Sequence, residues 1–147
     1  MKYTNNIETY NIWSGTDYNK NTNDFTIGTN AIITSTNNIA INGENSLAAK
    51  RTNVNSCNID TTHLNNVTVG KTITYKCKVY TPDMDVALRI RGANATIVNT
   101  VAPASDNIQE IMLSCIIPDN YSYMCMRMLP QEDDETFFVD DINCIIS

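Results

Sequence analysis

Short runs of alternating apolar and polar residues fill most of the chain, and this period of two is the pattern of β-strands rather than helices. The clearest run, residues 71–80, places Ile73, Tyr75, Cys77 and Val79 on one face and Thr74, Lys76, Lys78 and Tyr80 on the other. Residues 84–92 alternate again, with Val86, Leu88 and Ile90 opposite Ala87, Arg89 and Arg91. The alternation therefore predicts a strand in each segment, with one apolar face turned to a core.

Turn-forming residues separate these runs at regular intervals. Pro82-Asp83 and Pro118-Asp119-Asn120 are strong turn signals, and helical periodicity is almost absent. Together they delimit about ten short strands, which we expect at 24–27, 31–35, 39–41, 46–52, 71–80, 84–92, 95–101, 108–117, 121–129 and 136–146. The pattern predicts a single all-β domain over residues 1–147, a two-sheet antiparallel β-sandwich of the jelly-roll type.

Composition supports one globular domain and narrows its partners. Hydrophobic residues make up 42% of the 147 positions and charged residues 18%, which argues against disorder. The net charge of −6 repels phosphate backbones and anionic lipid, so nucleic-acid binding is not expected. No apolar run approaches the roughly 20 residues of a membrane span, so membrane insertion is not expected either.

The location of the protein stays open between three alternatives. The polar start of the chain lacks the apolar core of a signal peptide. The chain is therefore expected to be cytoplasmic, a piece of a larger exported protein, or a virion component, which needs no signal. Of these we favour an extracellular, cell-surface or virion-associated location, as part of a larger protein or assembly.

The five cysteines are odd in number and include no Cys-x-x-Cys pair. Four of them lie in apolar strand-like runs, namely Cys77, Cys115, Cys125 and Cys144. Free cysteine behaves as a small buried hydrophobe, so buried free thiols are expected, with at least one disulfide as the alternative. Cys77 and Cys115 share faces with apolar residues, and both are predicted to be buried and reduced.

Catalytic signatures are sparse in this chain. The only histidine, His63, lies in a turn-like stretch, and no Gly-x-Ser-x-Gly, His-Glu-x-x-His or glycine-rich phosphate loop occurs. A pair of carboxylates for glycoside hydrolysis leaves no local signature, so that possibility stays open. We therefore expect a binding protein without catalytic residues rather than an enzyme.

Four segments in order resemble one known pattern: Asn6-Ile7-Glu8 with Trp13, Gly43-Glu44-Asn45-Ser46-Leu47, residues 69–75 (VGKTITY) and residues 136–142 (TFFVDDI). They are similar to the "N-x-F-E … W", "G-x-x-S-L", "pG-x-x-Y" and "y-x-D-D-V" segments of xylan- and glucan-binding modules of the galactose-binding-like jelly-roll superfamily. The resemblance implies a jelly roll that binds a polysaccharide or glycan. Two departures are Ile7 in place of phenylalanine, and a single tryptophan where sugar-binding members usually display several aromatic rings.

The resemblance also implies a structural Ca²⁺ where the first and last strands meet. On the matching positions Glu8 and Asp140 would supply carboxylates, with Asp141 as the alternative to Asp140. The loop around Glu44 to Ser46 would supply carbonyl oxygens. The competing interpretation is that Asp140-Asp141 only protects a sheet edge or forms a salt bridge. The acidic run 132–135 lacks the ligand spacing of an EF-hand and is interpreted as a solvated turn.

A candidate binding face follows from the alternation itself. If the apolar sides of 71–80, 84–92 and 121–129 face the core, one outward surface is predicted, made of Tyr80, Arg89, Arg91, Tyr123 and Arg127. Aromatic rings and planar hydrogen-bonding groups hold sugars, so this surface is the predicted ligand-binding site. Tyr10 and Tyr18 are further candidates, Trp13 is expected to fill the core rather than to stack on a ligand, and a merely solvated basic face is the alternative.

Two functions therefore compete. The first is a carbohydrate-binding module of a cell-surface or polysaccharide-degrading protein, which the four-segment resemblance favours. The second is a structural or interaction domain, such as part of a surface adhesin or a phage tail, which would use the same sandwich for assembly.

Overall fold

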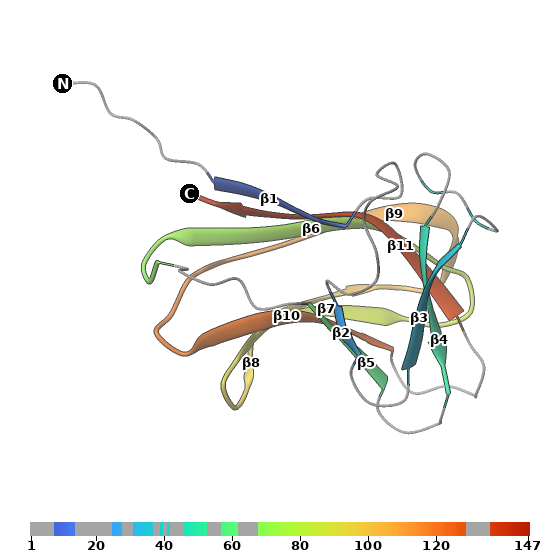
Figure 1. Ribbon diagram of the computed structural model, residues 1–147, viewed down its shortest axis with the longest axis horizontal. Coiled ribbons are helices and arrows are strands. Elements are labelled where there is room, and N and C mark those ends of the chain that lie inside the picture. Colours follow the sequence, from blue (N-terminus) through green and yellow to red (C-terminus); the bar gives the residue numbers. More distant parts are fainter. Residues whose placement is uncertain are drawn as a thin grey trace.

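The computed structural model describes residues 8–13, 25–27, 31–36, 39, 41, 46–52, 57–61, 68–128 and 136–147, which form two stacked β-sheets (Figure 1). The strands are β1 (Glu8–Trp13), β2 (Phe25–Ile27), β3 (Ala31–Thr36), β4 (Ser46–Arg51), β5 (Cys57–Thr61), β6 (Thr72–Thr81), β7 (Val86–Gly92), β8 (Thr96–Ala102), β9 (Ser105–Ile116), β10 (Tyr121–Met128) and β11 (Thr136–Ile146). Within these ranges no helix is long and apolar enough to cross a bilayer.

One sheet has six strands in the order β3-β4-β11-β6-β9, with β1 also paired to β11. The other has five, in the order β2-β5-β10-β7-β8. Every ladder is antiparallel. Strands far apart in the sequence lie side by side, as the jelly roll requires, and the last strand β11 lies between β4 and β6. The predicted all-β two-sheet antiparallel sandwich is confirmed.

The predicted strand positions hold where the alternation is long and fail where it is short. The run predicted at 136–146 coincides with β11, and the predicted 71–80 is shifted by one residue in β6. Ile39 and Ile41 lie in bends, so the strand predicted at 39–41 is wrong. Strand β5 was not predicted, because its Cys-Asn-Ile-Asp-Thr sequence is short and mostly polar and follows a stretch that contains Asn53 and Asn55.

The core lies between the two sheets and is built from the apolar faces that the alternation predicted. The six-stranded sheet contributes Ile73, Tyr75, Cys77 and Val79 of β6 and Phe137 and Val139 of β11. The five-stranded sheet contributes Val86, Leu88, Ile90, Met124, Met126 and Met128. All of these side chains are at most 3% exposed. Each fully buried aliphatic or methionine side chain contributes about 1.5–3 kcal/mol.

Strand β11 contains a β-bulge beside β6. Asp140 pairs with Lys78 but Asn143 pairs with Lys76, so two residues of β11 lie opposite one residue of β6. Asp141 in the bulge has φ = 49°, a left-handed conformation that costs a non-glycine residue roughly 1–2 kcal/mol. The bulge shifts the phase of the strand, because the buried residues change from Phe137 and Val139 to Ile142, Cys144 and Ile146.

Candidate functional site

Neighbouring strands β7 and β10 bring four of the five predicted ligand-binding residues onto one surface. In the register of this pair, Tyr123 lies opposite Arg91, Cys125 opposite Arg89 and Arg127 opposite Ala87. Their apolar neighbours in both strands face the core, so the alternate residues point away from it. We call this surface, made of Arg89, Arg91, Tyr123 and Arg127 on the outer side of the five-stranded sheet, the arginine face.

Strand β8 hydrogen-bonds two arginines of the arginine face, and the residues between the arginines are buried. The Nη1 of Arg91 donates to Thr96 Oγ1 at 2.5 Å, and the Nε of Arg89 donates to Asn99 Oδ1 at 3.4 Å. A guanidinium has five N–H donors, so one such bond orients the group and leaves other donors for a ligand. Between the arginines lie Ala87 and Cys125, which are 0% and 4% exposed although they belong to the outward rows.

Tyr80 is not part of this surface, and its inclusion in the predicted site is wrong. It belongs to β6 in the six-stranded sheet, so its outward side chain lies on the opposite side of the sandwich. There its ring packs against Phe138, with centroids 6.0 Å apart. The alternation gives the direction of a side chain relative to its own sheet, but it does not show to which sheet a strand belongs.

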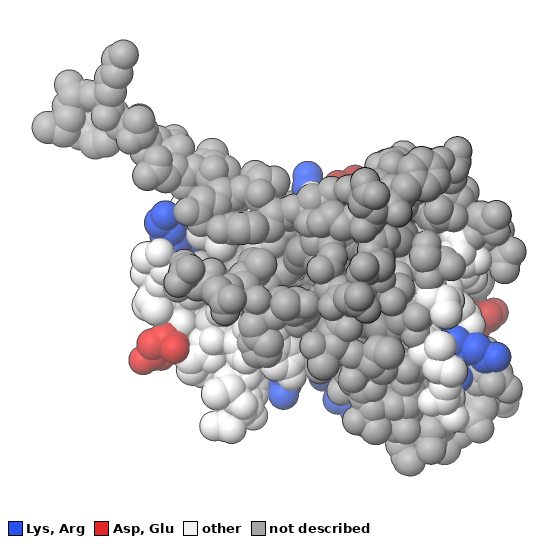
Figure 2. Space-filling model, in the orientation of Figure 1, with Lys and Arg blue, Asp and Glu red and all other residues white. Residues whose placement is uncertain are grey.

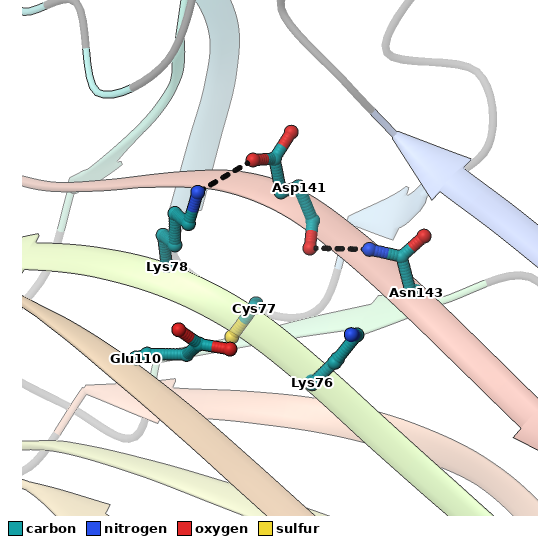
Figure 3. Close-up of a pocket in the computed structure, with 6 residues that line it drawn as sticks. All are labelled: Lys76, Cys77, Lys78, Glu110, Asp141 and Asn143. Carbon is teal, nitrogen blue, oxygen red and sulfur yellow. Dashed lines mark hydrogen bonds and ion pairs between the residues drawn. The ribbon is translucent and has the colours of Figure 1, made fainter.

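The outer side of the six-stranded sheet has a small polar pocket of about 180 Å³ (Figure 3). Its lining comes from β6, β9 and β11, and comprises Lys76, Cys77, Lys78, Glu110, Asp141 and Asn143. Figure 3 shows Lys78 turned toward Asp141, and the Nζ lies 3.1 Å from Asp141 Oδ2. The Nδ2 of Asn143 donates to the main-chain oxygen of Asp141 at 3.0 Å. The bulge thus directs the Asp141 carboxylate onto a lysine, and the pocket contains two lysines and two carboxylates.

The first and last strands do pair, but their register separates the predicted calcium ligands. Glu8 lies opposite Ile146, six residues along β11 from Asp140, which corresponds to about 20 Å of strand. Calcium binds its oxygen ligands at about 2.3–2.6 Å, so one ion cannot take both carboxylates. The Glu8–Asp140 pair is therefore wrong as a metal site.

Calcium binding itself stays a prediction. Asp140 is 0% exposed, and its Oδ1 accepts a hydrogen bond from the Asp141 amide at 2.7 Å. Asp141, the alternative carboxylate, is paired with Lys78. In the described part of the chain, no cluster of three or more His, Cys, Asp or Glu side chains is placed to hold a metal ion. Glu44 and the acidic run 132–135 lie outside the described residues.

The interior contains a hydrogen-bonded tyrosine pair beside a thiol. The hydroxyls of Tyr75 and Tyr121 lie 2.5 Å apart. Burial raises the pKa of Tyr75 above its ordinary value, and it raises the pKa of Tyr121 to about 12. Burial likewise raises the pKa of the Cys144 thiol to about 12, although its hydrogen bond to Tyr75 acts in the opposite direction. These groups are therefore neutral at ordinary pH.

The cysteines follow the sequence prediction with one correction. Cys77, Cys125 and Cys144 are buried free thiols, and burial raises the pKa of Cys77 to about 12. Cys115 is free but only half-buried, so the prediction that it is buried is wrong. It lies on the edge strand β9, where part of its side chain is not covered. The Cys57 side chain lies outside the described residues.

Several other sequence candidates lie outside the described part of the chain. His63 and Tyr18 are among them. Tyr10 and Trp13 lie in β1, where the backbone is described and the side chains are not. The arginine face is thus the predicted binding surface on which most of the predicted residues come together.

Comparison with solved structures shows that the chain shares the jelly-roll fold of carbohydrate-binding modules. The CBM22-1 xylan-binding domain of Paenibacillus barcinonensis Xyn10C gives a TM-score of 0.65 at 14% identity, covering 95% of this chain and 92% of that chain. The family 29 carbohydrate binding module CBM29_1 of Piromyces equi gives 0.63 at 13% identity, covering 95% and 91%.

A viral protein shares the fold as well. The enzymatically active domain of bacteriophage CBA120 tailspike protein 4 gives a TM-score of 0.58 at 9% identity, covering 82% of this chain but only 18% of that one. No family model and no curated protein matches the sequence. Identities this low show a shared fold, and function has to be argued from the site.

Proposed function

We propose that this chain is a non-catalytic carbohydrate-binding module whose ligand lies along the arginine face. The observation that carries the proposal is the convergence of Arg89, Arg91, Tyr123 and Arg127 on one side of one sheet, through the β7–β10 register. The fold shared with the xylan-binding CBM22-1 domain and with CBM29_1 supports the same conclusion.

The arginine face has the chemistry that sugar recognition uses. The Tyr123 ring offers an apolar plane for a pyranose ring, and the guanidinium groups offer planar donors for sugar oxygens. All four side chains stand on β7 and β10, each of which is hydrogen-bonded on both sides. A surface built on interior strands keeps its geometry when the ligand binds, which lowers the entropic cost of binding. An extended polysaccharide chain fits such a sheet face better than a compact ligand does.

A matched pair of tyrosines tests this proposal. Tyr123→Ala should lower the affinity for a bound polysaccharide about tenfold or more, because it removes the stacking plane. Tyr80→Ala removes the same side chain from the opposite sheet and should leave affinity within about twofold. The measurement is calorimetric titration with polysaccharides, including xylan and glucan, after far-ultraviolet circular dichroism has shown that both variants fold. Tyr123→Phe keeps the ring and should retain most of the affinity.

The opposite pattern would contradict the proposal: unchanged binding by Tyr123→Ala, or a loss confined to Tyr80→Ala. An absence of binding to every polysaccharide would favour a structural or interaction domain instead. One observation supports that alternative, because exposed apolar side chains follow the edge strand β9. Ile108 is 50% exposed, Met112 66% and Ile116 69%, and such a strip is typical of contact surfaces. A location on a cell surface or a virion suits either function.

A further inference from the structure

The arginines of this chain are concentrated on one surface although the chain is acidic. The net charge is −6, and the sequence contains four arginines. Three of them, Arg89, Arg91 and Arg127, belong to the arginine face, and the fourth, Arg51, is buried in β4. Figure 2 shows basic side chains along the lower side of the molecule, where the five-stranded sheet lies. The surface predicted to bind a ligand is therefore unlike the chain as a whole.

The register spaces these arginines evenly. Successive outward rows across β7 and β10 pair Arg91 with Tyr123, Arg89 with Cys125, and Ala87 with Arg127. Each row thus contains one guanidinium, and neighbouring rows are about 7 Å apart along the strands. One acidic residue, Asp60 of β5, holds a register position beside these rows, opposite Cys125. The arrangement is a line of three positive groups that follows the strand direction.

The side chains in these rows differ from those that are expected to bind a neutral sugar chain. Neutral sugars are held mainly by stacking on aromatic rings, and Tyr123 is the one aromatic member of the arginine face. A guanidinium is always charged, and its planar fork matches carboxylate and phosphate groups with two parallel hydrogen bonds. Three such forks in a line fit a linear chain with repeated negative groups.

We infer that the arginine face selects an acidic polysaccharide, one with carboxylate or ester sulfate or phosphate groups at regular intervals. The inference rests on the proposed function, since it specifies the ligand of the same surface. The chain as a whole carries a net negative charge, so attraction of a polyanion is expected to be strongest at these rows and to orient the ligand along them. The binding is expected to weaken as salt rises, because exposed charges are screened.

A matched pair of ligands tests the inference on the native chain. Polygalacturonate and its fully methyl-esterified form share one sugar backbone, and only the first is charged. Calorimetric titration at low salt should give at least about tenfold tighter binding to the acidic form, since charge-assisted hydrogen bonds are stronger than neutral ones. Dextran sulfate and dextran form a second pair. Tighter binding of dextran sulfate than of polygalacturonate would identify the sulfate ester as the preferred anion, and the reverse order would identify the carboxylate.

A matched pair of variants assigns the effect to the arginine face. The double substitution Arg89→Gln with Arg91→Gln should lower affinity for the acidic ligand at least about tenfold. Lys71→Gln, immediately before β6, with Lys76→Gln in β6 makes the same change in net charge on the side of the other sheet and should change affinity less than about twofold. Arg89→Lys with Arg91→Lys keeps the charge and loses the fork, so an intermediate affinity is expected. Thermal unfolding of each variant checks that it folds.

The outcomes separate this inference from the proposed function. Equal affinity for polygalacturonate and its methyl ester would overturn the inference and leave carbohydrate binding standing. Polyglutamate that binds as tightly as polygalacturonate would overturn carbohydrate recognition and leave the anion preference standing. Equal losses in the arginine and lysine double variants would show a general charge effect and overturn the assignment to this face.

Discussion

The two outer surfaces of this sandwich are built by the same alternation, yet they use their charges differently. On the six-stranded side Lys78 and Asp141 form an ion pair at 3.1 Å, and the pocket beside them balances two lysines against two carboxylates. On the five-stranded side the arginine face has one guanidinium in each of three rows. Figure 2 shows the same contrast, with basic next to acidic groups at the upper side and basic groups along the lower side.

The contrast shows where a ligand gains binding energy. A lysine that already contacts a carboxylate has to lose that contact before it binds an anion, so little net energy results. Arg89 and Arg91 donate to a neutral amide and a neutral hydroxyl of β8 instead, so an anion that binds these two groups does not have to displace a carboxylate from those contacts. The two lysines and two carboxylates of the pocket balance in charge, which is consistent with a structural role at the β11 bulge. The excess of positive groups on the arginine face is consistent with ligand binding.

The largest expected effect comes from the core that both surfaces share. Burial raises the pKa of Cys77 and of Cys144 to about 12, above the value of about 8.5 for a free cysteine. Between these two pKa values the folded state therefore keeps both thiol protons, whereas the unfolded state releases them. Stability is complete below the unfolded pKa and falls as pH rises toward the folded pKa, by about 1.4 kcal/mol per pH unit for each thiol.

Urea unfolding at a series of pH values between about 7 and 11 measures this loss of stability. Tyr75 and Tyr121 add to the loss at the alkaline end, because burial also raises the pKa of each. Cys77→Val removes one of the titrating groups and should make the pH dependence shallower. A stability that does not change over this range would show that the thiols are not buried as described.

Calcium is the next test, because it would change the balance of charge on the six-stranded side. If the ion binds, calcium at about a hundred times its dissociation constant stabilises the fold by about 2.7 kcal/mol and raises the melting temperature. Asp140→Asn should abolish the response. Glu8→Gln should preserve it, since Glu8 lies opposite Ile146 and far along β11 from Asp140. Identical melting curves in chelator and in calcium would remove calcium from the description of this protein.

The smallest effect concerns the bulge that shapes the pocket. Asp141 has φ = 49°, a conformation that asparagine and aspartate tolerate better than alanine. Asp141→Ala should therefore lower the free energy of unfolding by about 1 kcal/mol more than Asp141→Asn does. Asp141→Asn loses the ion pair with Lys78, a partly exposed contact worth at most about 1 kcal/mol. Chemical denaturation measures both, and a larger loss for asparagine would contradict the strain argument.

The bulge and the pocket were not predicted, although the sequence contains a signal for the first. Apolar residues in the last run change phase across Asp140-Asp141, from Phe137 and Val139 to Ile142 and Cys144. A strand without an extra residue cannot bury both sets on one face. No comparable signal marks the pocket, since Glu110 joins it from β9 through strand pairing.

The sequence by itself determined the fold class, most strand positions and which residues of each long strand face the core. Alternation is a local property, because successive side chains of any strand point to opposite faces. Tertiary structure alone decided that Arg89 and Tyr123 share a surface, that Tyr80 does not, and that Glu8 is far from Asp140. Strand order and register join segments that are distant in sequence, and packing of the whole core selects them.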